Sequence, residues 1–65
     1  MSVEREIQAL RVALRRAIKR GVTTKAIAAA GGVRSFSTVY RFMNGNGVAL
    51  STVLAIEAAR RKLKL

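Results

Sequence analysis

The sequence predicts an all-α protein, a compact domain of four helices spanning residues 1–65. Apolar residues recur at intervals of three and four along most of the chain, which is the period of an amphipathic helix. Glycines separate these segments, and glycine commonly marks a helix end. The chain contains no proline, and many of its other positions hold Ala, Arg, Lys, Gln or Glu, which are strong helix formers.

Residues 2–20 form the longest expected helix. One stripe along it is apolar and contains Val3, Ile7, Leu10, Leu14, Ala17 and Ile18. Ser2 is the expected N-cap, and Glu4 and Glu6 follow where the helix dipole favours negative charge. Four cations gather at the other end, namely Arg15, Arg16, Lys19 and Arg20. They either complete the electrostatics of the helix end or reach phosphates, and Gly21 closes the helix.

A second helix is expected over residues 23–30, because Thr23 can accept a hydrogen bond from an N–H group of the first turn. Gly31 and Gly32 end this helix, since glycine adopts the left-handed conformation that a helix C-terminus needs. Ala28 is small enough to allow another helix to approach closely.

A short third helix is expected over residues 35–44, with Ser35 as its cap. Its apolar face holds Val39, Phe42 and Met43, at positions i, i+3 and i+4. The opposite face holds Ser37, Thr38, Tyr40, Arg41 and Asn44. A short polar helix on a small basic body suits the DNA major groove, so residues 23–45 are predicted to form a helix-turn-helix.

The fourth helix is expected over residues 52–64, after Ser51 as its cap. Glu57 can pair with Arg61 one turn later. Its apolar residues are Val53, Leu54, Ile56, Ala58 and Leu63. The predicted core of the whole domain consists of Ile7, Leu10, Leu14, Ile18, Ile27, Val33, Val39, Phe42, Val53 and Leu54.

The residue types argue against an enzyme. The chain has no Cys and no His, which removes thiolate and imidazole chemistry. Its three acids are Glu4, Glu6 and Glu57, and the first two face different sides of a helix, so they form no catalytic pair. We therefore expect no catalysis, no cofactor, no metal ion and no small-molecule substrate.

The net charge indicates a polyanionic partner. Thirteen Lys and Arg residues give a formal charge of +10, whereas solubility needs a magnitude of only about 2 to 8. Nucleic acid is therefore the expected partner. No apolar run approaches the ~18 residues of a membrane span. The polar N-terminus is unlike a signal sequence, so we expect a cytoplasmic protein without membrane contact.

Two motifs carry a resemblance to a known family. IAAAGGV at residues 27–33 resembles the "(L/V)-A-x-x-A-G-V" of lambda-repressor-like and Lac-repressor-like helix-turn-helix domains, and TVYRFMNG at residues 38–45 is similar to their "T-V-S-R-(V/I)-(L/F)-N-G". The layout through residue 54 is especially like the antidote proteins of bacterial addiction modules. This chain has one residue more than the usual spacing between the motifs, Gly31 instead of alanine, and Arg60 where the family usually has leucine.

The resemblance implies sequence-specific binding of double-stranded DNA, with the helix at about residues 35–44 in the major groove. The expected base-contacting residues are Ser35, Phe36, Ser37, Tyr40 and Arg41. The expected phosphate-contacting residues are Thr23, Thr24, Lys25, Arg34, Thr38 and Asn44. Arg41 either binds guanine O6 and N7 or holds a phosphate. Phe36 either meets a thymine methyl group or folds under the turn into the core, and Tyr40 either contacts DNA or is half-buried.

Other interpretations stay open. An antidote-like protein-interaction module would show a flat apolar patch or a stable dimer, and a non-specific nucleic-acid binder would show no sequence preference. A membrane-active cationic peptide would need an exposed apolar face, which the predicted core uses. A monomer is favoured over a dimer, because no dedicated dimer segment is visible. The helix-forming composition without Pro, Cys, His or Trp favours an engineered miniprotein over an Ala/Arg-rich bacterial protein.

Overall fold

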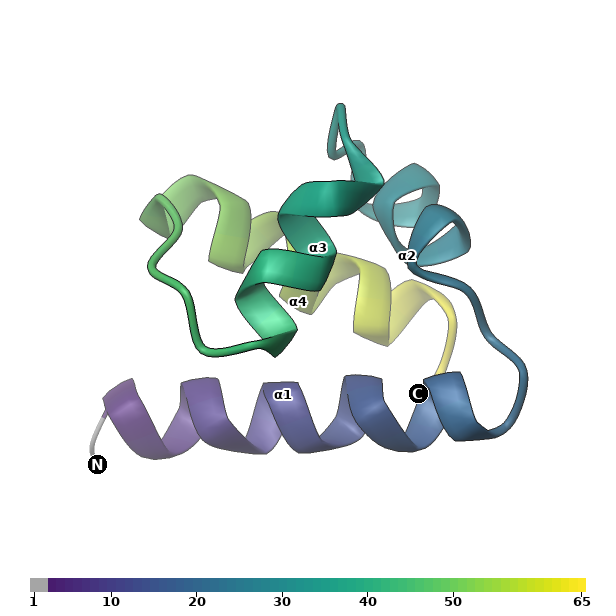
Figure 1. Cartoon of the computed structure of the whole chain (residues 1–65), viewed down its shortest axis with the longest axis horizontal. Coiled ribbons are helices and arrows are strands. Elements are labelled where there is room, and N and C mark those ends of the chain that lie inside the picture. The colour runs from purple at the N-terminus through teal and green to yellow at the C-terminus, as the bar shows by residue number, and fades with distance from the viewer. Residues whose placement is uncertain (1–2) are drawn as a thin grey trace.

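Four helices follow one another in the computed structural model, which describes residues 3–65. They are α1 (Val3–Lys19), α2 (Thr24–Gly31), α3 (Phe36–Met43) and α4 (Leu50–Lys62). The long helix α1 lies along one side, and the three shorter helices gather above it, with α3 in front of α4 (Figure 1). This arrangement confirms the predicted all-α fold of four helices, and no strand occurs within residues 3–65. The cap predicted at Ser2 lies outside the described residues.

The dimensions are those of one folded unit. The Cα radius of gyration is 10.5 Å, close to the ~11 Å typical of a folded chain of this length. None of the helices within residues 3–65 is long and apolar enough to cross a membrane.

All four helices end in the same hydrogen-bonded pattern. At the end of α2, the Val33 N–H donates to the Ala28 carbonyl (2.9 Å) and the Gly32 N–H to the Ala29 carbonyl (3.3 Å). This is the Schellman arrangement, and Gly32 takes its left-handed position at φ 70°. The sequence predicted two terminal glycines, but Gly31 still belongs to the helix. The corresponding left-handed residues after α1, α3 and α4 are Gly21, Gly45 and Lys64.

The core lies where the four helices meet. Its buried members are Leu10, Leu14, Ala17, Ile27, Ala28, Val39, Phe42, Met43, Ile56 and Ala59. Five predicted core residues are among them, and Ile7, Ile18, Val33 and Val53 pack against this cluster while partly exposed. Leu54 was predicted as core but is 62% exposed, and Ile56 is buried in its place. The apolar residues of α4 cover a broad arc, so the sequence pattern alone does not fix which side of the helix faces inward.

Close contact between α2 and α4 decides that orientation. A Cβ atom placed on Gly31 would lie 2.5 Å from the carbonyl oxygen of Ala55 and 3.2 Å from the Cβ of Ala59. The absence of a side chain at Gly31 therefore lets the two helices approach each other. This contact turns Ile56 and Ala59 toward the core and leaves Leu54 outside.

The start of α4 differs from the prediction. The helix begins at Leu50, and its N-cap is Ala49, which has no side chain that could cap it. The N–H groups of Thr52 and Val53 both donate to the Ala49 carbonyl, at 2.9 and 3.1 Å. Ser51 therefore lies within the first turn, and its predicted role as N-cap is wrong.

Candidate functional site

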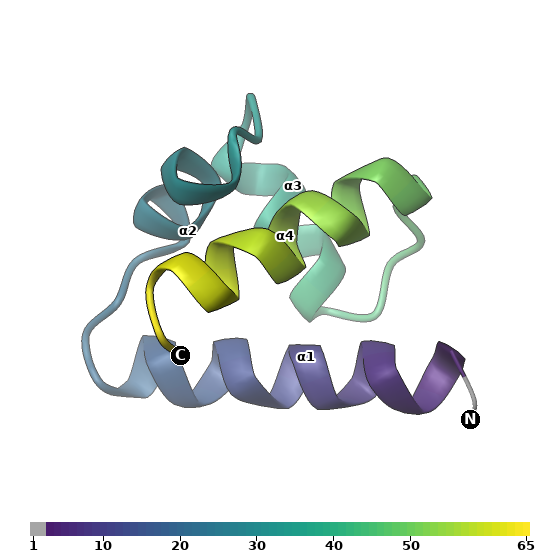
Figure 2. The same ribbon diagram turned by 180° about the vertical axis from the view of Figure 1, so that it is seen from behind.

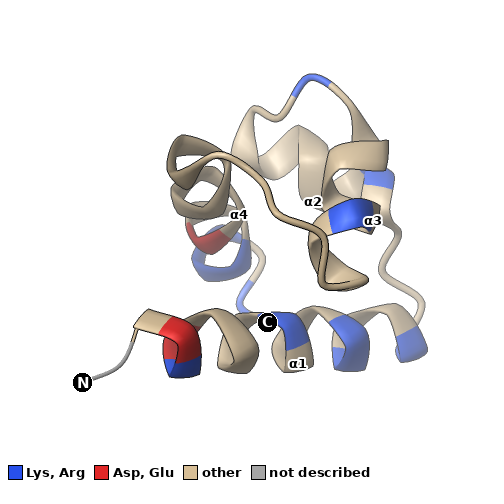
Figure 3. Cartoon of the chain, turned by 60° about the vertical axis from the view of Figure 1, so that its left-hand side comes forward, with Lys and Arg blue, Asp and Glu red and all other residues tan. Residues whose placement is uncertain are grey.

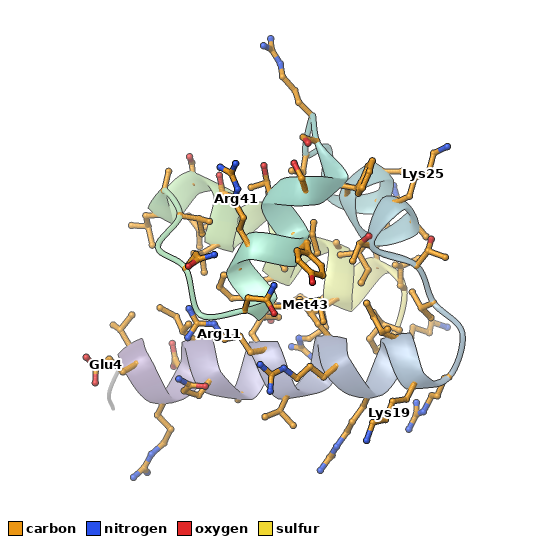
Figure 4. The ribbon with its side chains drawn as sticks, in the orientation of Figure 1. Glu4, Arg11, Lys19, Lys25, Arg41 and Met43 are labelled. Carbon is orange, nitrogen blue, oxygen red and sulfur yellow. The ribbon has the colours of Figure 1, made fainter. Side chains whose placement is uncertain are left out.

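One half of α3 is buried and the other half faces solvent. Val39, Phe42 and Met43 are 0%, 1% and 8% exposed, so the predicted apolar face is confirmed. The opposite half carries Phe36, Ser37, Tyr40, Arg41 and Asn44, which are all exposed, whereas Thr38 on its flank is half-buried. No other helix covers this exposed half in the front view of the molecule (Figure 4).

The amino end of α3 is fixed by two serines. Ser35 has extended backbone angles and accepts a hydrogen bond from the Ser37 N–H at 3.3 Å, which confirms it as the N-cap. The Oγ atoms of Ser35 and Ser37 are themselves 2.6 Å apart and share a hydrogen bond. Both hydroxyls are exposed, and each keeps further capacity to donate or accept a hydrogen bond to a ligand.

The carboxyl end of α3 is held by two arginines of α1. The Nε of Arg11 donates to the Phe42 carbonyl at 2.7 Å, and a terminal nitrogen of Arg15 donates to the Met43 carbonyl at 2.9 Å. The Arg11 guanidinium also lies 4.9 Å from the centre of the Phe42 ring, within cation–π range. These contacts place positive charge at the negative end of the helix dipole. They fix the orientation of α3 on the body of the protein.

Arg11 was not among the residues predicted to form the site. Its only signal is its position four residues after Ile7 and three before Leu14, on the edge of the apolar stripe of α1. Arg15 is one of the four cations expected either to complete the electrostatics of the helix end or to reach phosphates. A terminal nitrogen of Arg15 donates to the Met43 carbonyl, and the residue stays exposed.

Two aromatic rings stand on the exposed half of α3, one helical turn apart. Phe36 is 56% exposed and Tyr40 is 60% exposed. Phe36 therefore does not fold under the turn into the core, and Tyr40 is exposed and not half-buried. Exposed aromatic rings on a basic protein are suited to contact the apolar surface of a base.

The start of α2 carries three further candidates. The Thr23 hydroxyl accepts a hydrogen bond from the Ala26 N–H at 3.1 Å, which confirms it as the N-cap. Thr24 is half-buried and Lys25 is exposed. Lys25 extends from α2 on one side of α3, and Arg41 projects on the other side (Figure 4). Cationic side chains therefore extend on both sides of the exposed half of α3.

A shallow cleft of about 360 Å³ joins the turn between α2 and α3 to the start of α4. It brings together Arg34, Ser35 and Thr38 from the predicted site. Ser51 and Thr52 line the same cleft, although neither was among the predicted site residues. Four hydroxyl-bearing residues and one arginine thus line one concave surface. Asn44 is exposed at the opposite end of α3 and is not part of the cleft.

The exposed half of α3 has no acidic residue near it in the sequence, because the chain contains no Asp or Glu between Glu6 and Glu57. The acidic positions appear only near the start of α1 and in α4 (Figure 3). Glu57 is in addition engaged by Arg60 at 2.6 Å and Arg61 at 3.2 Å, which confirms the predicted pair with Arg61. The surface around α3 is therefore cationic without local compensation.

No protein-family model matches this chain, and no curated protein or solved structure matches it either. The geometry and charge of α3 are therefore the observations from which a function can be proposed.

Proposed function

We propose that this protein binds double-stranded DNA sequence-specifically, with α3 in the major groove. The observation that carries the proposal is the exposed polar half of α3, held rigidly at both ends on a body with a net charge of +10. A helix about 10–12 Å across with its side chains fits a groove about 12 Å wide. In that groove each base pair presents a distinct set of donors, acceptors and methyl groups.

Arg41 carries most of the sequence preference in this proposal. Its guanidinium is exposed on α3 and can donate two hydrogen bonds to O6 and N7 of one guanine. Phe36 contacts a thymine methyl group, because an exposed ring gains by leaving water. Ser35, Ser37 and Tyr40 add hydrogen bonds to neighbouring bases.

Phosphate contacts fix the position of α3 along the duplex. On one side they come from Thr23, Thr24 and Lys25 at the start of α2. On the other side Arg34 and Thr38 contact the backbone together with Ser51 and Thr52 of the shared cleft. Asn44 contacts a phosphate at the far end of α3.

The same proposal interprets α2, the turn and α3 as a helix-turn-helix of the lambda-repressor-like kind. The motifs at residues 27–33 and 38–45 support it, since they fall on α2, the turn and α3 in that order. One chain occupies one short site of a few base pairs, because eight residues of α3 contact only a short stretch of groove.

The test is selection from a library of randomised double-stranded DNA. The wild-type protein is expected to select one short preferred site. Arg41→Ala relaxes the preference at one guanine position and costs about 1–3 kcal/mol there. The matched control is Arg5→Ala, which removes the same charge from an exposed position nine residues before Leu14, on the opposite side of α1. This control keeps the wild-type preference.

Two results would revise the proposal. If Arg41→Ala lowers the affinity for all DNA sequences equally, Arg41 contacts a phosphate and not a base. If the wild-type protein selects no sequence at all, the protein is a non-specific nucleic-acid binder.

A further inference from the structure

A groove of about 550 Å³ runs between the first half of α1 and α4. Both helices can be followed in the view from behind (Figure 2), and none of the residues that line the groove belongs to α3. Val3, Leu50 and Leu54 line it and are 63%, 67% and 62% exposed. These are three of the seven large apolar side chains that are exposed among residues 3–65. The proposed DNA contacts use none of the three.

The charges around this groove balance. Glu6 and Glu57 line it together with Arg60 and Arg61, so two of the three acidic residues in the chain lie here. A DNA duplex gains little from a neutral surface. Two molecules that each carry a charge of +10, by contrast, can meet here without opposing like charges.

We propose that this groove is the interface of a symmetric dimer of the chain. In a two-fold interface the same surface is used twice, so a residue on one rim meets a residue on the other rim. Leu54 of each copy fills part of the groove of the other. Glu6 on the α1 rim lies opposite Arg61 of the partner subunit, whose own Glu6 lies opposite Arg61. Ala9 and Ala13 on the α1 side are small, which allows the partner to approach closely.

The dimer is weak. Twelve residues line the groove, whereas a stable interface uses about 20–30 residues on each side. We therefore expect a dissociation constant above ~1 μM. Added salt strengthens the dimer, because it screens the long-range repulsion between two cations of +10, with a Debye length of about 10 Å at 0.1 M and 3 Å at 1 M. DNA binding has the opposite salt dependence.

Analytical ultracentrifugation of the full chain, from micromolar to millimolar concentration and at low and high salt, tests the proposal. The wild-type protein is expected to show a monomer–dimer equilibrium that shifts toward dimer as salt rises. Leu54→Gln raises the dissociation constant about tenfold or more, because two leucine side chains lose their burial in the dimer. The control is Val12→Gln, which changes an apolar residue 46% exposed on the far side of α1 and leaves the equilibrium unchanged. Both side chains are exposed in the monomer, so both variants fold.

Charge exchange provides a second test. Glu6→Arg weakens the dimer, because it places one cation opposite another. Combining Glu6→Arg with Arg61→Glu restores the dimer toward wild-type strength. A protein that stays monomeric at millimolar concentration at both salt levels overturns the proposal, and so does equal behaviour of Leu54→Gln and Val12→Gln. The outcome is independent of DNA binding, since Leu54→Gln leaves α3 unchanged and is expected to select the wild-type DNA site.

Discussion

The surroundings of Glu57 favour the ionised form of its carboxylate. Arg60 donates to both of its carboxylate oxygens, at 2.6 and 3.1 Å, and Arg61 donates to one of them at 3.2 Å. Hydrogen bonds from Arg60 lower the pKa of Glu57, and this effect exceeds the opposite effect of burial. Arg60 also donates to the Leu65 carbonyl at 3.3 Å. The arginine at a position where the resembled family usually has leucine thus ties Glu57 to the end of the chain.

This arrangement predicts how stability depends on pH. Because the pKa of Glu57 is lower in the folded state than in the unfolded one, its stabilisation is fully present above the unfolded value of about 4.3. It is lost as the pH falls through the folded pKa. Glu57→Gln is therefore expected to lower the free energy of unfolding by about 0.5 kcal/mol at neutral pH, a small value because the pair is partly exposed. Urea unfolding at neutral and acid pH measures the difference, which should vanish in acid. An equal difference at both pH values would contradict the assignment.

At the scale of elements, the contact of α2 with α4 determines the packing of the domain. Gly31→Ala is expected to lower the free energy of unfolding by about 1–3 kcal/mol, because the new Cβ would meet the Ala55 carbonyl, which is backbone and cannot turn away. Gly32→Ala is the matched comparison, since nothing lies within 4 Å of its Cβ and φ is +70°. Its cost of about 1–2 kcal/mol comes from the left-handed backbone alone.

Thermal unfolding measures the stability of both variants. A further variant identifies the atom that the new Cβ of Gly31→Ala meets. Replacing Ala59 by Gly in the Gly31→Ala background leaves the clash with the Ala55 carbonyl in place, so it should not restore stability. A Gly31→Ala protein as stable as the wild type would mean that α2 and α4 can separate without cost.

The helices also show which features of the fold can be predicted from the sequence and which cannot. The four helices and the capping by Thr23 and Ser35 follow from local chemistry, and the sequence predicts them correctly. The orientation of α4 does not follow from local chemistry. Ile56 rather than Leu54 is buried because of the contact at Gly31. The spacing of the apolar residues in α4 does not reveal that contact. Ser51 is not the cap, because α4 begins one residue earlier, at Leu50, and Ala49 is its N-cap.

Only part of the candidate site could be predicted from the sequence. The exposed face of α3 follows from its period, because Val39, Phe42 and Met43 define the buried side. Arg11 could not be foreseen, since its partner carbonyl at Phe42 lies thirty-one residues away in the chain. Thr52 entered the cleft beside Arg34 only through the packing of α4 against the turn.

For the molecule as a whole, the distribution of charge determines how DNA affinity responds to salt. Cations lie on α2, the turn and α3, at Lys25, Arg34 and Arg41, while two of the acids line the groove between α1 and α4. If α3 enters the major groove and about five phosphates are neutralised, the logarithm of the DNA association constant should fall with the logarithm of salt concentration at a slope of about −4 to −5. Lys25→Ala should make that slope less steep by about 0.9 and should weaken binding to all DNA sequences equally. Lys62→Ala, which removes the same charge at the exposed end of α4, should leave it unchanged. Fluorescence anisotropy titrations over a range of salt concentrations measure both. A slope near zero would rule out the phosphate contacts, and equal effects of the two lysines would mean that DNA binds the basic surface as a whole and not the side that bears α3.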